Sequence, residues 1–299
     1  MEVLGVAEEL ILSVENDLQL RRPILICGWS GWNDAGMAAS DSVAFMRTRL
    51  KFQKIAEIDP DSFYDFTQVR PTVHLSNGER ILKWPSNEIS GQRFENGQHD
   101  LMLLHGIEPH LAWQTYVDSI LTICRDYEVS GVVLLGALLS DVSHRAESTV
   151  NGSSTDGDLA TLLEIEPRTR GSYEGPTGIV GVMSEALRDA GIPSASLWAN
   201  APYYLGSGKN PRCQLALLKR INSTFGLEMS LHDMESRITR WEARIEGELN
   251  KDPDLAALAD KIENPESDAS DESDVLPDSD EIVDEIENFF REQQDEDSA

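Results

Sequence analysis

The architecture is set by the stretch Ile24-Leu25-Ile26-Cys27-Gly28-Trp29-Ser30-Gly31-Trp32-Asn33-Asp34-Ala35-Gly36, in which an apolar run leads into three glycines and two tryptophans. The pattern predicts a buried strand over residues 24–27 that turns sharply into a helix over residues 34–50, with Asn33 or Asp34 as its N-cap. Such a turn places the N–H groups of a helix N-terminus at the carboxyl edge of a sheet, where α/β proteins bind ligands or partners.

Outside this stretch, strand and helix patterns alternate along the chain. Further strands are expected at 54–58, 100–104, 131–135 and 194–198, and helices at 110–127, 178–190 and 211–225. Asn77-Gly78 predicts a hairpin that joins strands at 73–75 and 80–84. The polar residues 143–175 are expected to form a long functional loop or a small insert. This order predicts an α/β fold, a three-layer sandwich with a mostly parallel central sheet.

The composition divides the chain into three parts. Residues 1–226 form the α/β core, and residues 227–262 form a C-terminal helical extension that packs on the core or at an oligomer seam. Residues 263–299 are an acidic tail that is expected to be disordered, with a short amphipathic helix at 280–293. The apolar residues of that helix would dock in a partner's groove or fold back on the same chain; they are Ile282, Val283, Ile286, Phe289 and Phe290.

The formal charge of −28 is concentrated near the C-terminus. Residues 250–299 hold 19 acidic and 3 basic side chains, which leaves 34 acidic and 22 basic side chains in residues 1–249. A field of this sign repels phosphates, so neither nucleic acid nor an anionic membrane surface is an expected partner. The three cysteines form no Cys-x-x-Cys pair, and the apolar runs are too short to span a membrane. We expect a cytoplasmic protein with free thiols.

Complete catalytic motifs are missing from the glycine turn. Its Gly31-to-Gly36 frame resembles a phosphate-binding loop, but Met37-Ala38 stand where Lys and Ser or Thr are needed. Gly28-Trp29-Ser30-Gly31 is one residue short of a serine-hydrolase elbow. The histidines show no metal-ligand spacing, so neither a metal nor a cofactor is expected.

A different cluster has the composition of a site. Asp141, His144 and Arg145 follow a central strand and could serve acid–base or phosphate chemistry, or form a loop salt bridge beside a solvated histidine. Arg70 is a second candidate anchor, or an ordinary arginine before a strand. Together with Asn33 and Asp34 these residues make up the candidate pocket.

Several sequence blocks, taken in order, resemble the bacterial branch of the proteasome assembly chaperone 2 family. The blocks are Gly28–Gly36, Phe63-Tyr64-Asp65-Phe66, Arg70-Pro71-Thr72-Val73, Gly106-Ile107-Glu108-Pro109 with Trp113, Leu135-Gly136-Ala137-Leu138, Tyr173-Glu174-Gly175-Pro176-Thr177-Gly178, Ser196-Leu197-Trp198-Ala199 and Pro202-Tyr203-Tyr204. The resemblance implies a phosphorylase/hydrolase-like sandwich. It also implies a non-enzymatic protein that binds proteasome subunits as a homo-oligomer, although no settled activity for the bacterial branch.

The C-terminus departs from the family pattern. Archaeal and eukaryotic relatives often end in a hydrophobic-Tyr-x tail, whereas this chain ends Asp295-Glu296-Asp297-Ser298-Ala299. Residues 282–290 are therefore the tail element with enough apolar area to anchor a partner. The leading hypothesis is a homo-oligomeric interaction protein with a protein partner, proteasome-related by resemblance. The alternative is a small-molecule binder or enzyme with a site near Asp141, His144 and Arg145.

Overall fold

The computed structural model describes residues 10–14, 18–76, 78–95, 97–165, 174–206 and 208–264. The chain divides into two units, Met1–Ile262 and Glu263–Ala299, and the elements below are those of the first unit and its boundary. The amphipathic helix predicted at 280–293, with its five apolar side chains, lies outside the described residues.

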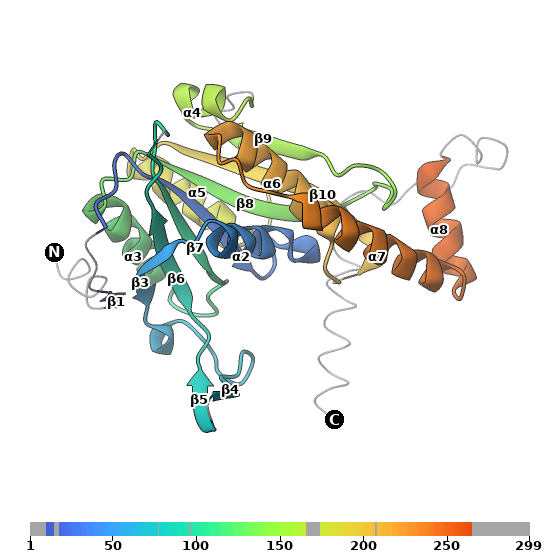
Figure 1. Ribbon diagram of the computed structural model, residues 1–299, viewed down its shortest axis with the longest axis horizontal. Coiled ribbons are helices and arrows are strands. Elements are labelled where there is room, and N and C mark those ends of the chain that lie inside the picture. The colour runs from blue at the N-terminus through green and yellow to red at the C-terminus, as the bar shows by residue number, and fades with distance from the viewer. Residues whose placement is uncertain are drawn as a thin grey trace. The chain divides into compact units, whose positions relative to one another are not determined.

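An eight-stranded sheet forms the centre of the fold, in the order β1-β3-β6-β7-β2-β8-β10-β9 (Figure 1). The four strands β7, β2, β8 and β10 run parallel, while β1, β3, β6 and β9 add antiparallel pairs at the two sides. The strands are β1 (Ile11–Ser13), β2 (Ile24–Ser30), β3 (Gln53–Ile58), β6 (Asn87–Gln92), β7 (Leu101–Ile107), β8 (Gly131–Ser140), β9 (Val150–Ser154) and β10 (Ser194–Pro202).

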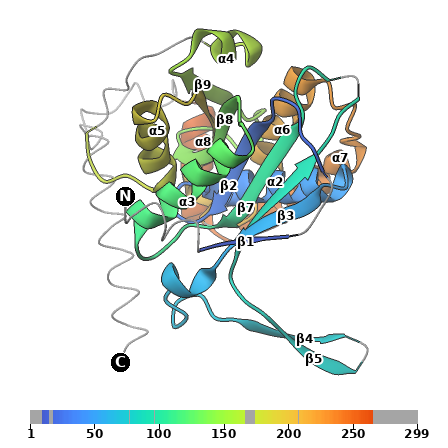
Figure 2. The same ribbon diagram turned by 90° about the vertical axis from the view of Figure 1, so that its left-hand side faces the viewer.

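Helices cover both faces of the sheet, with α2 and α6 on one side and α3 and α5 on the other (Figure 2). Alternation along β2 explains the two layers, since Ile24 and Ile26 join the first core and Leu25 and Cys27 join the second. The helices are α2 (Ala38–Arg49), α3 (Trp113–Asp126), α4 (Gly157–Leu162), α5 (Ile179–Asp189), α6 (Pro211–Phe225), α7 (His232–Leu249) and α8 (Pro253–Glu263), with short 3-10 turns η1 (Ala35–Met37), η2 (Pro60–Ser62) and η3 (Tyr203–Leu205).

The predicted α/β class and its layered sheet are confirmed, and the strands absent from the prediction lie at the sides of the sheet. β6 has a polar sequence, Asn-Glu-Ile-Ser-Gly-Gln, yet most of it is buried between β3 and β7. The polar insert at 143–175 supplies β9, which pairs with β10, and α4. Apolar periodicity identifies strands that are covered on both faces, and it misses strands whose buried positions are Asn and Ser.

The first helix begins later than its sequence pattern predicts. Gly36 and Met37 have φ of +64° and +53°, so the chain makes a separate turn, η1, before α2 starts at Ala38. A Cβ on Gly36 would lie 2.5 Å from the Cβ of Asn210, and the Asn210 N–H donates to the Gly36 carbonyl at 2.8 Å. Glycine is required here for both its φ and its close approach to the start of α6.

Two further parts leave the layered core. β4 (Thr72–Ser76) and β5 (Glu79–Lys83) form a separate antiparallel ribbon with the register of the predicted hairpin. The long helix α7 packs against α6 and buries Met234, Trp241, Ile245 and Leu249. Three of these four side chains share a small core with Tyr204 and Ala259 of α8.

Candidate functional site

The turn that follows β2 meets the end of β7 at the carboxyl edge of the parallel strands. Glu108 comes directly after β7, and its backbone N–H donates to the Ser30 carbonyl at 2.8 Å. The Glu108 carboxylate accepts from the Trp32 N–H at 3.0 Å and from the Ile179 N–H at 2.7 Å. Ile179 is the first residue of α5, so a carboxylate of the chain itself occupies this positive helix end.

Asn33 completes the cap on the same helix. Its side-chain oxygen accepts from the Val180 N–H at 3.3 Å, and its backbone oxygen accepts from the Ala137 N–H of β8 at 2.9 Å. A Cβ on Gly178 would lie 2.1 Å from that side-chain oxygen. The helix end that could receive an anionic ligand is therefore closed by Asn33 and Glu108.

Asp34 has a different task, at the start of α2. Its carboxylate accepts from the Ala39 N–H at 2.7 Å and from the hydroxyl of Ser40. Burial raises the pKa of the Asp34 carboxyl to about 6, although the hydrogen bonds from Ser40 and Ala39 act in the opposite direction. Asp34 is 6% exposed. The N-cap residue of α2 is Met37, and neither Asn33 nor Asp34 as predicted, because η1 intervenes; the Asp34 carboxylate nevertheless binds the first turn of α2.

His144 lies in a hydrogen-bonded network that attaches α7 to the sheet. The Tyr204 hydroxyl accepts from the His144 backbone N–H at 2.8 Å and lies 2.6 Å from its Nδ1. An ionised carboxylate can only accept, so Nε2, which lies 3.3 Å from the Glu246 carboxylate, carries a proton; in a neutral ring Nδ1 then accepts from the Tyr204 hydroxyl. Arg145 donates to both oxygens of Glu246 at 2.9 Å, and this pair lowers the pKa of that carboxyl.

The candidate residues fall into separate places. Asn33 and Asp34 bind the first turns of two different helices, while His144 and Arg145 share Glu246. Asp141 is exposed. The pKa of Tyr203 is raised mainly by the burial of Tyr203 and secondly by the negative charge of Asp141. Arg70 is exposed just before β4, and within the described ranges it has no hydrogen bond or ion pair. The structure thus does not gather the candidate set around one space.

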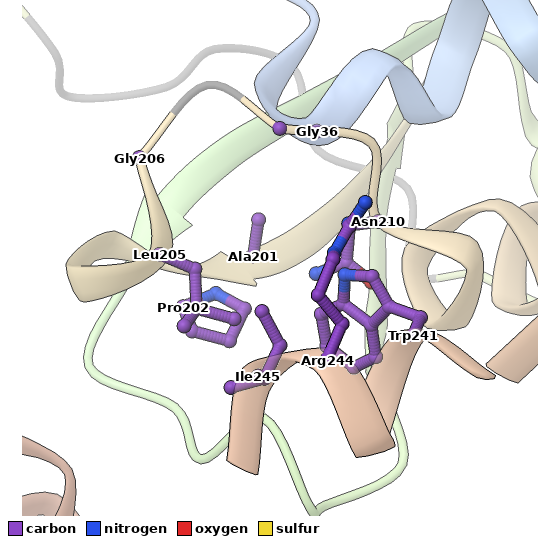
Figure 3. A pocket seen from close by; sticks show the side chains of 10 residues that line it. Gly36, Ala201, Pro202, Leu205, Gly206, Asn210, Trp241, Arg244 and Ile245 are labelled. Atoms are coloured by element: carbon purple, nitrogen blue, oxygen red, sulfur yellow. The ribbon is translucent and has the colours of Figure 1, made fainter. Parts of the chain in front are cut away.

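The spaces beside Gly36 and beside His144 are small. The space between Gly36, Asn210, Trp241 and Ile245 has a volume of about 30 Å³ (Figure 3). The one beside His144 has about 10 Å³, so these two spaces have room for a few water molecules at most. A larger hollow of about 480 Å³, bordered by Arg212, Lys219 and Ile238, is open to solvent. Across the described part of the chain, no three His, Cys, Asp or Glu side chains are placed to hold a metal ion.

The carboxyl edge exposes apolar side chains. We define the apolar edge as Trp32, Leu111, Leu138 and Leu139, which are between 41% and 57% exposed. Trp32 follows β2, Leu111 follows β7, and the two leucines lie near the end of β8. The bonds from Glu108 to Ser30 and from Ala137 to Asn33 bring these three strand ends together. Apolar side chains gathered at one edge of a folded domain are typical of a protein-binding surface.

Sequence reasoning did not give Glu108, Tyr204 or Glu246 a role. Glu108 and Tyr204 occur in the family blocks quoted above, but each binds a residue 60 or more positions away. Glu246 looked like one of many charges on an amphipathic helix, and its partners lie 101 and 102 positions earlier. The strand order and the path of α7 bring such residues together.

Comparison with known proteins gives the class and the family of this fold. The eight-stranded sheet with helices on both faces defines a protein of the α/β class. The model of the PAC2 family matches residues 28–249, and the chain belongs to the PAC2 family. No curated protein matches the chain. Across the described residues, no helix is long and apolar enough to cross a lipid bilayer.

Solved structures show the same fold. A PAC2 family protein from Streptomyces avermitilis is 37% identical with a TM-score of 0.69, and the match covers 75% of this chain and 95% of the other. A proteasome-assembly chaperone homologue from Mycobacterium tuberculosis is 34% identical with a TM-score of 0.67, covering 79% and 99%. An archaeal proteasome activator from Pyrococcus furiosus, 18% identical, has a TM-score of 0.65 over 79% and 97%, which shows a shared fold.

Proposed function

We propose that the chain is a non-enzymatic, chaperone-like protein that binds a protein partner of the proteasome system and acts as a homo-oligomer. The observation that carries this proposal is the contrast at the carboxyl edge. The N-terminus of α5 is closed by Glu108 and Asn33, while Trp32 and three leucines of the apolar edge face solvent. The names of the similar structures from Mycobacterium tuberculosis and Pyrococcus furiosus support a proteasomal partner.

The apolar edge has the chemistry of a protein contact. Trp32 is 57% exposed, although its backbone N–H is held by Glu108. A tryptophan on a fixed backbone loses little conformational entropy on binding and provides a large contact area. Tryptophan is enriched among the residues that dominate binding energy at interfaces.

The alternative of a small-molecule binder or enzyme near Asp141, His144 and Arg145 has weaker support. Both ring nitrogens of His144 already have partners, Tyr204 and Glu246. The space beside His144 is about 10 Å³, whereas ligand pockets are commonly several hundred Å³. Arg145 is likewise committed to Glu246.

Purified α-type proteasome subunits of the organism that encodes the chain provide the test. We expect the full chain to bind them in biolayer interferometry, and Trp32→Ala to raise the dissociation constant about tenfold or more. Leu12→Ala is the matched control, because Leu12 of β1 is 49% exposed, and this variant should bind like the parent chain. Absence of binding by the full chain, or equal effects of the two variants, would refute the proposal.

The contribution of the acidic tail is tested in a second binding measurement. We propose that Ile282, Val283, Ile286, Phe289 and Phe290 contribute to docking. A chain that ends at residue 264 should then bind more weakly than the full chain while keeping its sensitivity to Trp32→Ala. Equal affinity of the two lengths would assign binding to the apolar edge alone.

A further inference from the structure

The ribbon of β4 and β5 is a two-stranded sheet of its own, whereas the other described strands belong to the eight-stranded sheet. Every described residue from Thr72 to Trp84 is exposed, and the two strands pair only with each other among the described strands. Figures 1 and 2 both show the ribbon extending away from the eight-stranded sheet. At its base the rings of Phe66 and Trp84 touch, with centroids 5.0 Å apart. A two-stranded ribbon alone is marginally stable in water, so this one is expected to gain a partner.

One face of the ribbon is apolar. Val73 stands opposite Leu82 and Leu75 stands opposite Arg80, so these four side chains share a face. The three apolar ones are 47%, 77% and 56% exposed for Val73, Leu75 and Leu82. Ile81, on the other face opposite His74, is 51% exposed. Apolar exposure of this extent on one small element indicates a contact surface.

We propose that β5 pairs with β5 of a second copy of this chain, antiparallel and centred on Ile81. The inference names the self-association surface of the homo-oligomer and rests on that part of the proposed function. A two-fold axis through Ile81 places Glu79 opposite Lys83 of the partner subunit, and Lys83 opposite Glu79 of the partner subunit. Both ion pairs and the central isoleucines lie on one face, because residues two apart along a strand share a face.

Charge selects this register over its neighbours. A two-fold axis perpendicular to the sheet pairs residues whose side chains lie on the same face. The axis must therefore pass through a residue of β5, and alternative registers differ in which residue that is. Centring on Arg80 sets two arginines opposite each other, and like charges directly opposite are destabilising. Centring on Leu82 sets Glu79 opposite Pro85 of the partner subunit and leaves both charged pairs unmade. The centre at Ile81 makes two opposite-charge pairs and no like-charge pair.

The outer edge of β4 lacks this selectivity. Its sequence Thr-Val-His-Leu-Ser contains no acid. A two-fold pairing centred on its middle residue would set His74 opposite His74 of the partner subunit. β5 holds three charged residues in five, and these specify one register and one partner, the same sequence. Pairing through β5 makes a four-stranded sheet, on which Arg80 lies beside Leu82 of the partner subunit and covers it with its aliphatic stem.

Charge variants of the full chain test the pairing. Glu79→Lys places lysines opposite each other, and Lys83→Glu places glutamates opposite each other. Each variant alone should weaken dimerisation on the order of tenfold, measured by sedimentation velocity. An equimolar mixture of the two variants should regain dimers, because the mixed pair restores both ion pairs. Lys51→Glu, an exposed change in the turn after α2, is the control and should leave dimerisation unchanged.

Each outcome decides the inference. A parent chain that stays monomeric up to about 100 µM, or dimers that are insensitive to both charge variants, would overturn it. Failure of the mixture to regain dimers would overturn the proposed register. Binding of the variants to proteasome subunits, and its dependence on Trp32, is measured in parallel. Dimers that are insensitive to the charge variants, together with Trp32-dependent binding, would show that this inference fails while the proposed partner holds.

Discussion

At the residue scale, the most constrained side chain of the glycine turn is Asp34. Burial opposes its ionisation, yet its carboxylate holds the first turn of α2 through Ala39 and Ser40. The raised pKa, about 6, compares with about 3.9 for an unfolded aspartate. The stabilising contribution of a group with a raised pKa is complete below the unfolded value and is lost as pH rises through the folded value. The contribution of Asp34 to the free energy of unfolding is therefore expected to fall progressively as the pH rises from about 4 to 7.

Asp34→Asn should flatten that part of the pH profile. The amide keeps an oxygen for the Ala39 N–H and carries no charge to desolvate. Between pH 5.0 and 7.5 the free energy of unfolding of the parent should fall by about 1 kcal/mol relative to the variant. Urea denaturation at the two pH values measures this difference. Asp126→Asn, at an exposed aspartate at the end of α3, is the control, and parallel profiles for parent and Asp34→Asn would contradict the expectation.

At the scale of elements, a polar network adds to the apolar contacts that hold α7. Tyr204, His144 and Glu246 come from η3, the segment after β8 and α7, and the His144 side chain is fully buried. The sequence left open a site at Asp141, His144 and Arg145 or a loop salt bridge beside a solvated histidine. In the structure His144 is buried, and Arg145 forms its salt bridge with the helix α7 and not within the loop. The partner is Glu246, so the network connects a helix to the sheet edge.

Glu246→Ala should loosen the attachment of α7. The buried Nε2–H of His144 would lose its acceptor, at a cost of about 1–2 kcal/mol, and the exposed Arg145 pair would add less. Hydrogen exchange of amides in residues 232–249 should accelerate, while exchange in β8 should not change. Glu248→Ala removes an exposed pair with Lys251 and is the control. Equal exchange in the two variants would show that the apolar contacts of Trp241 and Ile245 hold the helix alone.

At the scale of the whole molecule, net charge competes with association. Two copies that each carry −28 repel each other over a Debye length, whereas the proposed pairs between Glu79 and Lys83 act at contact distance. Salt screens the long-range repulsion before it removes the contact pairs. The effect of salt on dimerisation therefore depends on the net charge of the whole molecule and not on the ribbon of β4 and β5 alone.

Dimerisation should therefore strengthen with moderate salt. Between about 10 and 150 mM NaCl the Debye length falls from about 30 to 8 Å, and we expect the dimer dissociation constant to decrease several-fold. Sedimentation velocity across this range measures it, with sucrose at matched osmolality as the control. A dissociation constant that increases with salt would show that opposite charges dominate the interface.

Much of the fold follows from local pattern. Apolar runs such as Ile24–Cys27 and 131–135 report strands covered on both faces, because burial of a continuous run is possible only in the middle of a layered sheet. Asn77-Gly78 predicted the hairpin between β4 and β5, since its register leaves two residues for the turn. The family blocks led to the PAC2 family, which the match over 28–249 confirms. The polar strand β6 left no comparable signal.

The sequence by itself determined the order of the apolar strands and the longer helices, the glycine turn and the excess of acid, because each depends on residues close together in the chain. Only the tertiary structure decided which groups meet. Glu108 reaches Ile179 across 71 positions, and His144 reaches Glu246 across 102. Local periodicity reports whether a side chain is buried, but its partner depends on the strand order and the path of α7. For that reason the turn that resembled a phosphate cradle is closed by the chain's own carboxylate.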